Sequence, residues 1–220
     1  MAGYIETIYD ENVRPRTEYP QQLCAHLMSR FQIPRGARIL DAGCGRGDFL
    51  NGFQLHGLEV FGVDAEPASV KVNGAVVKCA ELENGALPFT DNYFDVVFSK
   101  SVIEHLFNPE KFVSECRRVL KPGGRIIMMT PDWESTMKVF FDDYSHRQPY
   151  TRTALKDLLT MFKFREVSAE IFYQLPVVWR YPALKIVSRI LQLIVPVTAK
   201  SPVKFIRWSV ELMVLGTGIK

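Results

Sequence analysis

The stretch that decides the fold is Ile39-Leu40-Asp41-Ala42-Gly43-Cys44-Gly45-Arg46-Gly47. It has the form of a short apolar strand, a glycine turn and the start of a helix. Glycines permit a positive φ and let a ligand approach the backbone closely, and the free N–H groups at the start of a helix attract an anionic group. Taken alone, the same pattern also suits a tight structural turn, so a binding loop needs support from elsewhere in the chain.

A carboxylate after the next apolar run gives that support. Asp64 ends the sequence LEVFGVD and lies 23 residues beyond Asp41. A carboxylate at this place can accept hydrogen bonds from two ribose hydroxyls, in nicotinamide and in S-adenosylmethionine (SAM) sites alike; by itself it could equally be a helix N-cap. Asp48 stands where the dinucleotide pattern G-x-G-x-x-G has its last glycine, which disfavours a nicotinamide cofactor.

The rest of the chain alternates apolar strands with helices. Near-continuous apolar strands between helices are typical of a parallel sheet covered on both faces, with right-handed crossovers. We therefore predict an α/β fold with a doubly wound, mostly parallel, seven-stranded Rossmann-like sheet, and a ligand beyond the carboxyl ends of its strands. Strands are expected at residues 37–41, 58–64, 75–79, 94–99, 124–130, 164–172 and 210–216. Helices are expected at 19–31, from 48, at 109–120 after Asn108 as N-cap, and at 151–162 with Thr151 as N-cap.

Composition bounds the class of protein. The 220 residues suit one domain, and the formal net charge of +3 is too small to indicate nucleic-acid binding. No stretch of about 18 apolar residues predicts a spanning helix, and residues 1–16 lack the apolar segment of a secretory signal. The four cysteines form no CxxC pair, which predicts no metal site, no disulfide framework and a cytoplasmic location; they are Cys24, Cys44, Cys79 and Cys116.

Four motifs then follow one another in order. They are ILDAGCGRGDFL (39–50), VFGVDAEP (60–67), LPFTDNYFDVVFSKSVIEHL (87–106) and RVLKPGGRIIMMTP (118–131). With them the chain resembles the class I SAM-dependent methyltransferases over about residues 35–172. The E-H after the fourth strand and the K-P-G-G before the fifth are most similar to the small-molecule branch of that family. The resemblance implies a Rossmann-like methyltransferase that uses SAM as its cofactor.

The resemblance also implies a role for each matching position in holding SAM. The loop residues Asp41, Gly43, Cys44 and Gly45 would cradle the methionine end, Asp64 would bind the ribose, Ala65 would pack on the adenine, Ala80 and Glu81 would meet the adenine edge, and the Ser99 backbone would meet the methionine amino group. One position departs from the pattern. Cys79 stands where similar proteins often carry Asp, so Glu81 is expected to take over the contact with the adenine amino group.

Methyl transfer needs alignment of donor and acceptor more than it needs acid–base chemistry. A general base is required only where the acceptor is protonated, as a hydroxyl is. The candidates are His105, just past the fourth strand, and His146, in a polar loop after the fifth. Each is a base or a hydrogen-bond donor to substrate in one interpretation, and a cap for backbone groups in the other. His26 and His56 are interpreted as structural.

A late segment differs from everything before it. Residues 171–210 contain six basic residues and no acidic one. Within it, residues 182–195 read as a helix that is apolar except for one polar stripe, Lys185, Ser188, Arg189 and Gln192. In the family's topology an insertion here lies over the substrate, so 174–207 is expected to form a helical lid or membrane-facing insertion within a single domain spanning 1–220.

Three interpretations of this insertion stay open. It is a buried substrate cap, a membrane-interface segment that inserts Trp179, Ile190, Leu191 and Ile194, or a contact in a homodimer. The first two favour a small, hydrophobic or lipid-linked acceptor with an oxygen or nitrogen nucleophile, and the second places the protein at the membrane surface. The competing functions are a nicotinamide-dependent oxidoreductase and a non-catalytic, membrane-associated SAM-fold module.

Overall fold

The computed structural model describes residues 15–66, 70 and 72–220; the expectation that the N-terminal stretch is no secretory signal falls on residues 1–14, outside this part. Its centre is a seven-stranded sheet in the order β3-β2-β1-β4-β5-β7-β6. The strands are β1 (Arg38–Ala42), β2 (Glu59–Asp64), β3 (Val76–Cys79), β4 (Phe94–Lys100), β5 (Leu120–Pro131), β6 (Arg165–Phe172) and β7 (Met213–Ile219). β1 to β5 pair in parallel, whereas β7 runs antiparallel between β5 and β6. The predicted mostly parallel α/β sheet is confirmed.

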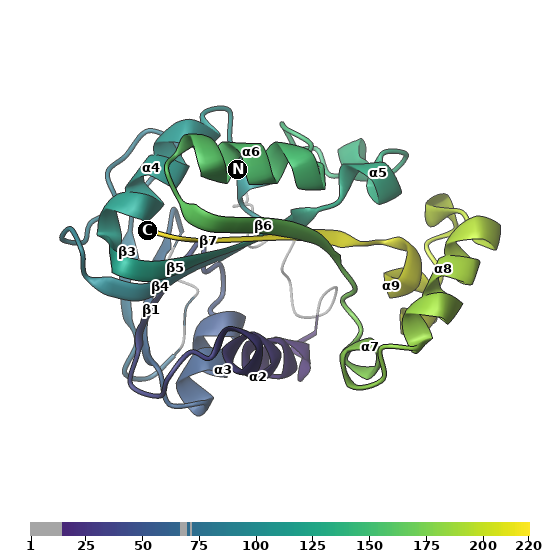
Figure 1. Cartoon of the computed structure of the whole chain (residues 1–220), viewed down its shortest axis with the longest axis horizontal. Helices are drawn as coiled ribbons and strands as arrows, with labels where there is room; N and C mark the ends of the chain where they lie inside the picture. Colours follow the sequence, from purple (N-terminus) through teal and green to yellow (C-terminus); the bar gives the residue numbers. More distant parts are fainter. Residues whose placement is uncertain (1–14, 67–69, 71) are drawn as a thin grey trace.

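Helices cover both faces of the sheet (Figure 1). On one face lie α4 (Pro109–Val119) and α6 (Arg152–Met161), and on the other α2 (Tyr19–Phe31) and α3 (Asp48–Leu55). The predicted caps are confirmed, because Asn108 accepts a hydrogen bond from the backbone N–H of Lys111 at the start of α4, and Thr151 accepts one from Ala154 at the start of α6. Each face of the sheet has its own buried apolar core beneath these helices.

Two strand boundaries were predicted wrongly. The last strand begins at Met213 rather than at residue 210 and continues past Gly216 and Gly218. Both glycines lie inside the strand, at positions where a Cβ would collide with Leu155 or Phe164. Similarly, β5 begins at Leu120 and includes the K-P-G-G sequence that was expected to precede it.

The segment between β6 and β7 folds into α7 (Pro176–Arg180), α8 (Leu184–Ile194) and α9 (Lys204–Val210), beyond the carboxyl ends of the parallel strands (Figure 1). It encloses a small third core of Tyr173, Leu175, Val178 and Leu212. Within the described part of the chain, no helix combines the length and the apolarity that crossing a membrane requires.

The polar stripe predicted on α8 exists, and its Ser188 and Gln192 face the body of the protein, whereas Lys185 and Arg189 are exposed. Ser188 is fully buried and shares a hydrogen bond of 2.9 Å with Ser209, and Gln192 donates to the Ser209 carbonyl. The apolar face of α8 is exposed instead, with Leu193 85% and Ile194 70% accessible. An ordinary surface helix buries its apolar face, so α8 is turned over.

Trp179 does not belong to this exposed face. Its ring stacks on His26 with centroids 4.6 Å apart, and its indole N–H donates to the carbonyl of Tyr173. The expectation that Trp179 inserts into a membrane is therefore wrong, because the ring is already packed between α2 and the end of β6. His26 has the structural role that was expected of it.

Candidate functional site

The glycine loop after β1 is shaped by hydrogen bonds to β2. Gly43 and Cys44 both donate to the carbonyl of Val63, and the N–H of Gly45 donates to Oδ2 of Asp64 at 2.8 Å. Gly43 has a φ of +86° and no room for a side chain, because a Cβ there would overlap Val102. A Cβ at Gly45, in contrast, would meet no atom within 4 Å. The loop therefore packs against the protein at Gly43 and is open at Gly45, as a backbone that receives a ligand must be.

Two carboxylates lie at this loop. Asp64 accepts hydrogen bonds from Gly45 and, through Oδ1, from the N–H of Glu66. Asp41 is 2% exposed, and its Oδ2 makes no hydrogen bond to any described residue. Burial, with the nearby charge of Asp64, raises the pKa of Asp41 to about 8. An unsatisfied buried carboxyl is costly, so Asp41 is poised to bind a donor that the protein does not itself provide.

The remaining predicted cofactor residues gather at the same sheet edge. Ser99, at the end of β4, is 1% exposed and donates its hydroxyl to the carbonyl of Ala42. Ala80 follows β3 and donates its N–H to the carbonyl of Asp64. The exposed Cys79 donates to the carbonyl of Ala65, while the exposed Glu81 accepts a hydrogen bond from Asn84. The loop thus lies beside the residues expected to meet ribose and adenine.

Cys44 differs from its neighbours in the loop. Its side chain is 5% exposed and packs against Gly62, where a Cβ would lie 2.9 Å from Sγ. Its N–H is bonded to Val63 and its carbonyl accepts from Gly47. The polar groups of Cys44 are therefore occupied in forming the turn, and its thiol faces the core.

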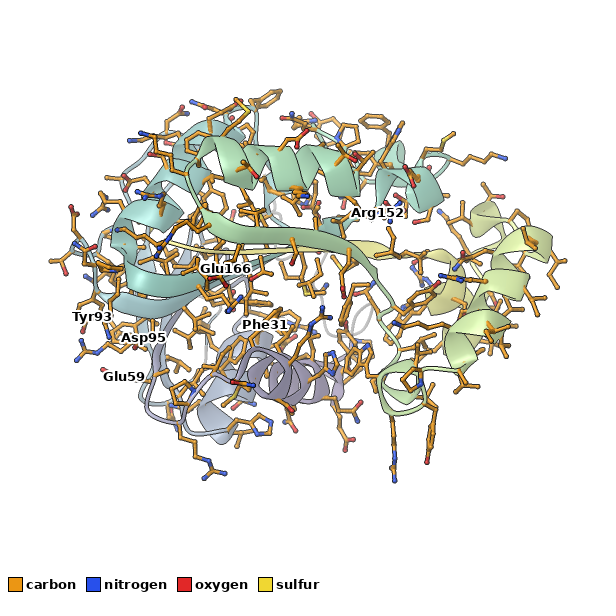
Figure 2. The ribbon with its side chains drawn as sticks, in the orientation of Figure 1. Phe31, Glu59, Tyr93, Asp95, Arg152 and Glu166 are labelled. Carbon is orange, nitrogen blue, oxygen red and sulfur yellow. The ribbon has the colours of Figure 1, made fainter. Side chains whose placement is uncertain are left out.

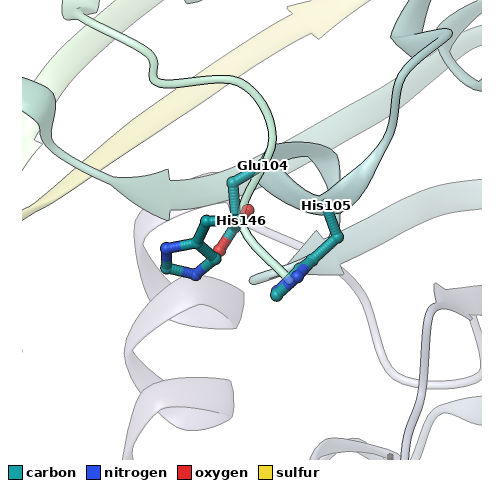
Figure 3. A group of neighbouring side chains, drawn as sticks. All are labelled: Glu104, His105 and His146. Carbon is teal, nitrogen blue, oxygen red and sulfur yellow. The ribbon is translucent and has the colours of Figure 1, made fainter. Parts of the chain in front are cut away.

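The two candidate histidines come together although 41 positions separate them in sequence. His105 ends a short 3₁₀ helix, η2 (Ile103–His105), after β4, and His146 lies in the loop after β5. Their ring centroids are 4.8 Å apart, and both side chains point toward Glu104 (Figure 3). The loop is held there because Arg147 and Gln148 donate their N–H groups to the carbonyl of Glu104.

The hydrogen bonds fix which nitrogen of each ring carries the proton. Nδ1 of His146 lies 2.6 Å from the carbonyl of Phe140, which can only accept, so Nδ1 is the donor. Nδ1 of His105 lies 3.0 Å from the hydroxyl of Ser145, whose own hydrogen goes to Asp143. In the neutral form of each ring, Nδ1 is therefore the nitrogen that carries the proton. Burial, and then the neighbouring His146, lower the pKa of His105, which keeps that ring neutral and able to accept a proton.

Glu104 is a site residue that the sequence reasoning missed. It is fully buried; Oε2 accepts a hydrogen bond from Thr130, and Oε1 has no partner among the described residues. Burial raises the pKa of Glu104 to about 7. The signal was present in the E-H pair, but it was used only to recognise a motif, because alternation in the sequence does not reveal a buried acid.

The cluster adjoins a pocket of about 180 Å³ that is lined by His146, Lys100, Phe140, Gln174, Glu211 and Met213, among others. One ligand atom from each of Glu104, His105 and His146 lies within 4.8 Å of the others, so the group could also hold a metal ion. The prediction of no metal rested on cysteines and did not consider this group. Chemically, the arrangement can accept a proton from a molecule in the pocket or coordinate a cation beside it.

Comparisons with known proteins agree with this architecture. A family model described as a methyltransferase domain matches residues 40–128. A ubiquinone biosynthesis O-methyltransferase of Cereibacter sphaeroides is 33% identical over 120 residues, covering 50% of this chain and 49% of the relative. An uncharacterized protein of Methanocaldococcus jannaschii is 31% identical over 147 residues, covering 62% of this chain and 68% of the relative.

The crystal structure of a SAM-dependent methyltransferase from Archaeoglobus fulgidus has the same fold, with a TM-score of 0.67, 20% identity and coverage of 99% of this chain and 100% of that one. The chain spans about half the length of the ubiquinone biosynthesis relatives that it matches. The family model, over residues 40–128, includes the glycine loop and ends before the insertion.

Proposed function

The chain belongs to the class I SAM-dependent methyltransferases, and from that premise we propose that it transfers a methyl group from SAM to a small molecule bound beside His105 and His146. When bound, SAM supplies a methyl group on a positively charged sulfur. The observation that carries the proposal is the open backbone at Gly45 between the carboxylates of Asp41 and Asp64, at the sheet edge that also bears the histidines.

In this proposal each residue at the loop has a separate task. Asp41 pairs with the donor groups at the methionine end. Of the two carboxyls at the loop, only Asp41 has an oxygen without a hydrogen-bond partner among the described residues. Gly43, Cys44 and Gly45 form the turn on which that end rests, and Asp64 holds the ribose. The further contacts assigned to SAM are those of Ala65, Ala80 and Glu81 with the adenine, and of the Ser99 backbone with the methionine.

His105 and His146 act as proton acceptors in the proposed reaction. As the acceptor oxygen or nitrogen forms its bond to the methyl carbon, the bond from carbon to sulfur breaks and the acceptor's proton passes to an Nε2 lone pair. The hydrogen bonds at both Nδ1 atoms and the lowered pKa of His105 support this role. Glu104 positions both histidines through its backbone and stabilises a protonated ring through its carboxylate.

We further propose a hydrophobic or lipid-linked acceptor, taken up at a membrane surface. The support is the outward apolar face of α8, in a segment without acidic residues between 171 and 210. The ubiquinone biosynthesis enzyme that resembles half of the chain is named for the synthesis of a lipid-soluble molecule. The insertion is then a lid whose outer face contacts lipid, and a second copy of the chain is the alternative occupant of that face.

Calorimetric titration with SAM tests the core of the proposal. Asp64→Ala is expected to weaken SAM binding by roughly 1–3 kcal/mol, because hydrogen bonds to a charged group are lost. Asp95→Ala is the matched control: Asp95 also accepts a backbone N–H bond, from Arg38, but at the opposite end of the sheet. Equal SAM affinity of the wild type and Asp64→Ala would overturn the assignment.

A further inference from the structure

A second cavity lies between the insertion and the edge of the sheet, apart from the pocket at His146. Its volume is about 720 Å³. Its walls come from the segment after β5, the start of α6, the end of β6, α8 with the residues that follow it, and the stretch before β7. Arg152 lies at the end of α6 nearer to α8 and α9 (Figure 2). No motif of the sequence pointed to this cavity.

The cavity is rich in positive charge. Lys138, Arg152, Lys185 and Arg189 line it, and within the described ranges none of the four forms an ion pair. Arg118, in contrast, is paired with Glu115 and Asp91. Only two acids, Asp132 and Glu134, are among the lining residues described. The cavity therefore has an excess of two positive charges and no internal partner for them.

A buried, unpartnered polar atom belongs to the same cavity. Asp132 is 2% exposed; its Oδ2 accepts the N–H of Ser135, but Oδ1 has no partner among the residues described. Burial raises the pKa of this carboxyl. The wall of the cavity thus includes a buried polar oxygen that no described residue satisfies.

The orientation of α8 has a reason in this cavity. Turning its polar face inward exposes Ile186, Ile190, Leu193 and Ile194 to solvent, which forgoes the burial that normally holds a helix in place. Lys185 and Arg189 are thereby directed to the cavity, while Ser188 and Gln192 anchor the helix to Ser209. The inward face thus combines an anchor with two cations that have no structural partner.

The cavity also adjoins the proposed reaction site. Leu212 lines both this cavity and the pocket at His146. Asp132 and Tyr173 on the cavity side are neighbours in sequence of Pro131 and Gln174 on the pocket side. A molecule with one group held in the cavity can therefore extend past Leu212 toward His146.

We propose that this basic cavity binds a phosphate or pyrophosphate group of the methyl acceptor. The inference rests on the proposed methyl transfer and gives its substrate class: a phosphorylated molecule. Two guanidinium groups and two ammonium groups suit a multiply charged phosphoryl group better than a single carboxylate, because arginine binds phosphate oxygens in pairs and lysine adds point charges. The exposed apolar residues of α8 favour a lipid phosphate over a free phosphorylated metabolite.

The test measures binding of inorganic pyrophosphate and of a short-chain, water-soluble phosphatidic acid by calorimetry. The double variant Arg152→Gln/Arg189→Gln is expected to bind both probes more than about ten-fold more weakly, since charge-assisted hydrogen bonds are lost. The control Arg180→Gln/Lys204→Gln removes the same charge from side chains that are not among the cavity's lining residues, and should keep wild-type affinity. Unchanged SAM affinity in both variants shows that they are folded.

Each outcome decides one question. Equal losses in the two double variants, or no binding of either probe by the wild type, would overturn the phosphoryl site. Tighter binding of phosphatidic acid than of pyrophosphate, with the excess lost in Ile190→Gln/Leu193→Gln, identifies a lipid phosphate; equal affinities identify a free phosphorylated metabolite. Pyrophosphate binding by a protein that does not bind SAM would refute the methyltransferase proposal and leave the anion site standing.

Discussion

The sheet edge formed by β1 to β5 and the insertion formed by α7 to α9 differ in which side chains they bury. At the edge, apolar strands are buried on both faces and the few buried polar groups, such as Asp41 and Glu104, lie where a ligand is expected. In the insertion, α8 buries Ser188 of its polar stripe and exposes most of its apolar face. The periodicity of polar residues in the sequence therefore predicts that α8 has a polar and an apolar face, but only the structure shows which face is turned inward.

Removing the histidines is expected to have the largest effect on the sheet-edge side of this comparison. His105→Ala and His146→Ala should each lower turnover by about 10²–10⁴-fold on a hydroxyl acceptor, because a positioned base is lost. SAM affinity should change little, since neither ring lies at the glycine loop. Single-turnover rates and SAM titrations on the same preparations separate the two effects.

The control for this experiment is His56→Ala, whose ring contacts only the carbonyl of Gln21 among the described residues. Full turnover in both active-site variants would show that neither histidine is a base. Turnover that is abolished by chelation and restored by one divalent metal ion would instead assign Glu104, His105 and His146 to metal binding.

A second contrast compares Gly43 of the glycine loop with Gly123, a glycine of similar positive φ in β5. Gly43→Ala should destabilise the fold by about 3 kcal/mol and abolish SAM binding, because its Cβ overlaps Val102. Gly123→Ala, at a φ of +79° with no atom within 4 Å of the added Cβ, should cost only about 1 kcal/mol and leave SAM binding intact. Urea denaturation and SAM titration of both variants measure this difference. Similar losses of stability and of SAM binding in the two variants would mean that backbone strain, and not the overlap with Val102, causes the effect.

Most of the fold could be predicted because it follows from local rules. The apolar strands, the caps at Asn108 and Thr151, and the order of the motifs are all encoded over short stretches. The gathering of His105 and His146 could be expected from strand ends, which meet at one edge of a parallel sheet. Glu104, the cavity at Arg152 and the inward stripe of α8 could not, since they depend on how distant elements pack.

The buried acid at the histidines gives a pH-dependent prediction. The pKa of Glu104 is about 7 in the folded protein against an ordinary 4.5, so between these values the native state holds a proton that the unfolded state releases. Stability should therefore fall as pH rises from 4.5 to 7. Glu104→Gln cannot ionise, and we expect it to be more stable than the wild type by roughly 1–3 kcal/mol at pH 8 and equal at pH 4.

Chemical denaturation at a series of pH values measures this curve, and the gain in stability should accompany a loss of turnover because the histidines lose their carboxylate. Glu59→Gln, an exposed partner of Arg38, is the control and should show no such dependence. Equal stability of Glu104→Gln and the wild type at both pH 4 and pH 8 would remove the case for a strained acid at the site.

The smallest expected effect sharpens the contrast at α8 itself. Ile190→Gln/Leu193→Gln should change the free energy of unfolding by only about 0.5 kcal/mol, because both side chains are more than half exposed. Ser188→Leu, an apolar substitution on the same helix, should cost about 1–3 kcal/mol, because it leaves Ser209 buried without its partner and has no space. On a conventional amphipathic helix the order would be reversed. Thermal unfolding of the two variants tests the orientation of α8 independently of any ligand. Flotation of Ile190→Gln/Leu193→Gln with vesicles of anionic phospholipid then tests whether the apolar face, which contributes little to folding, is needed for binding to a lipid surface.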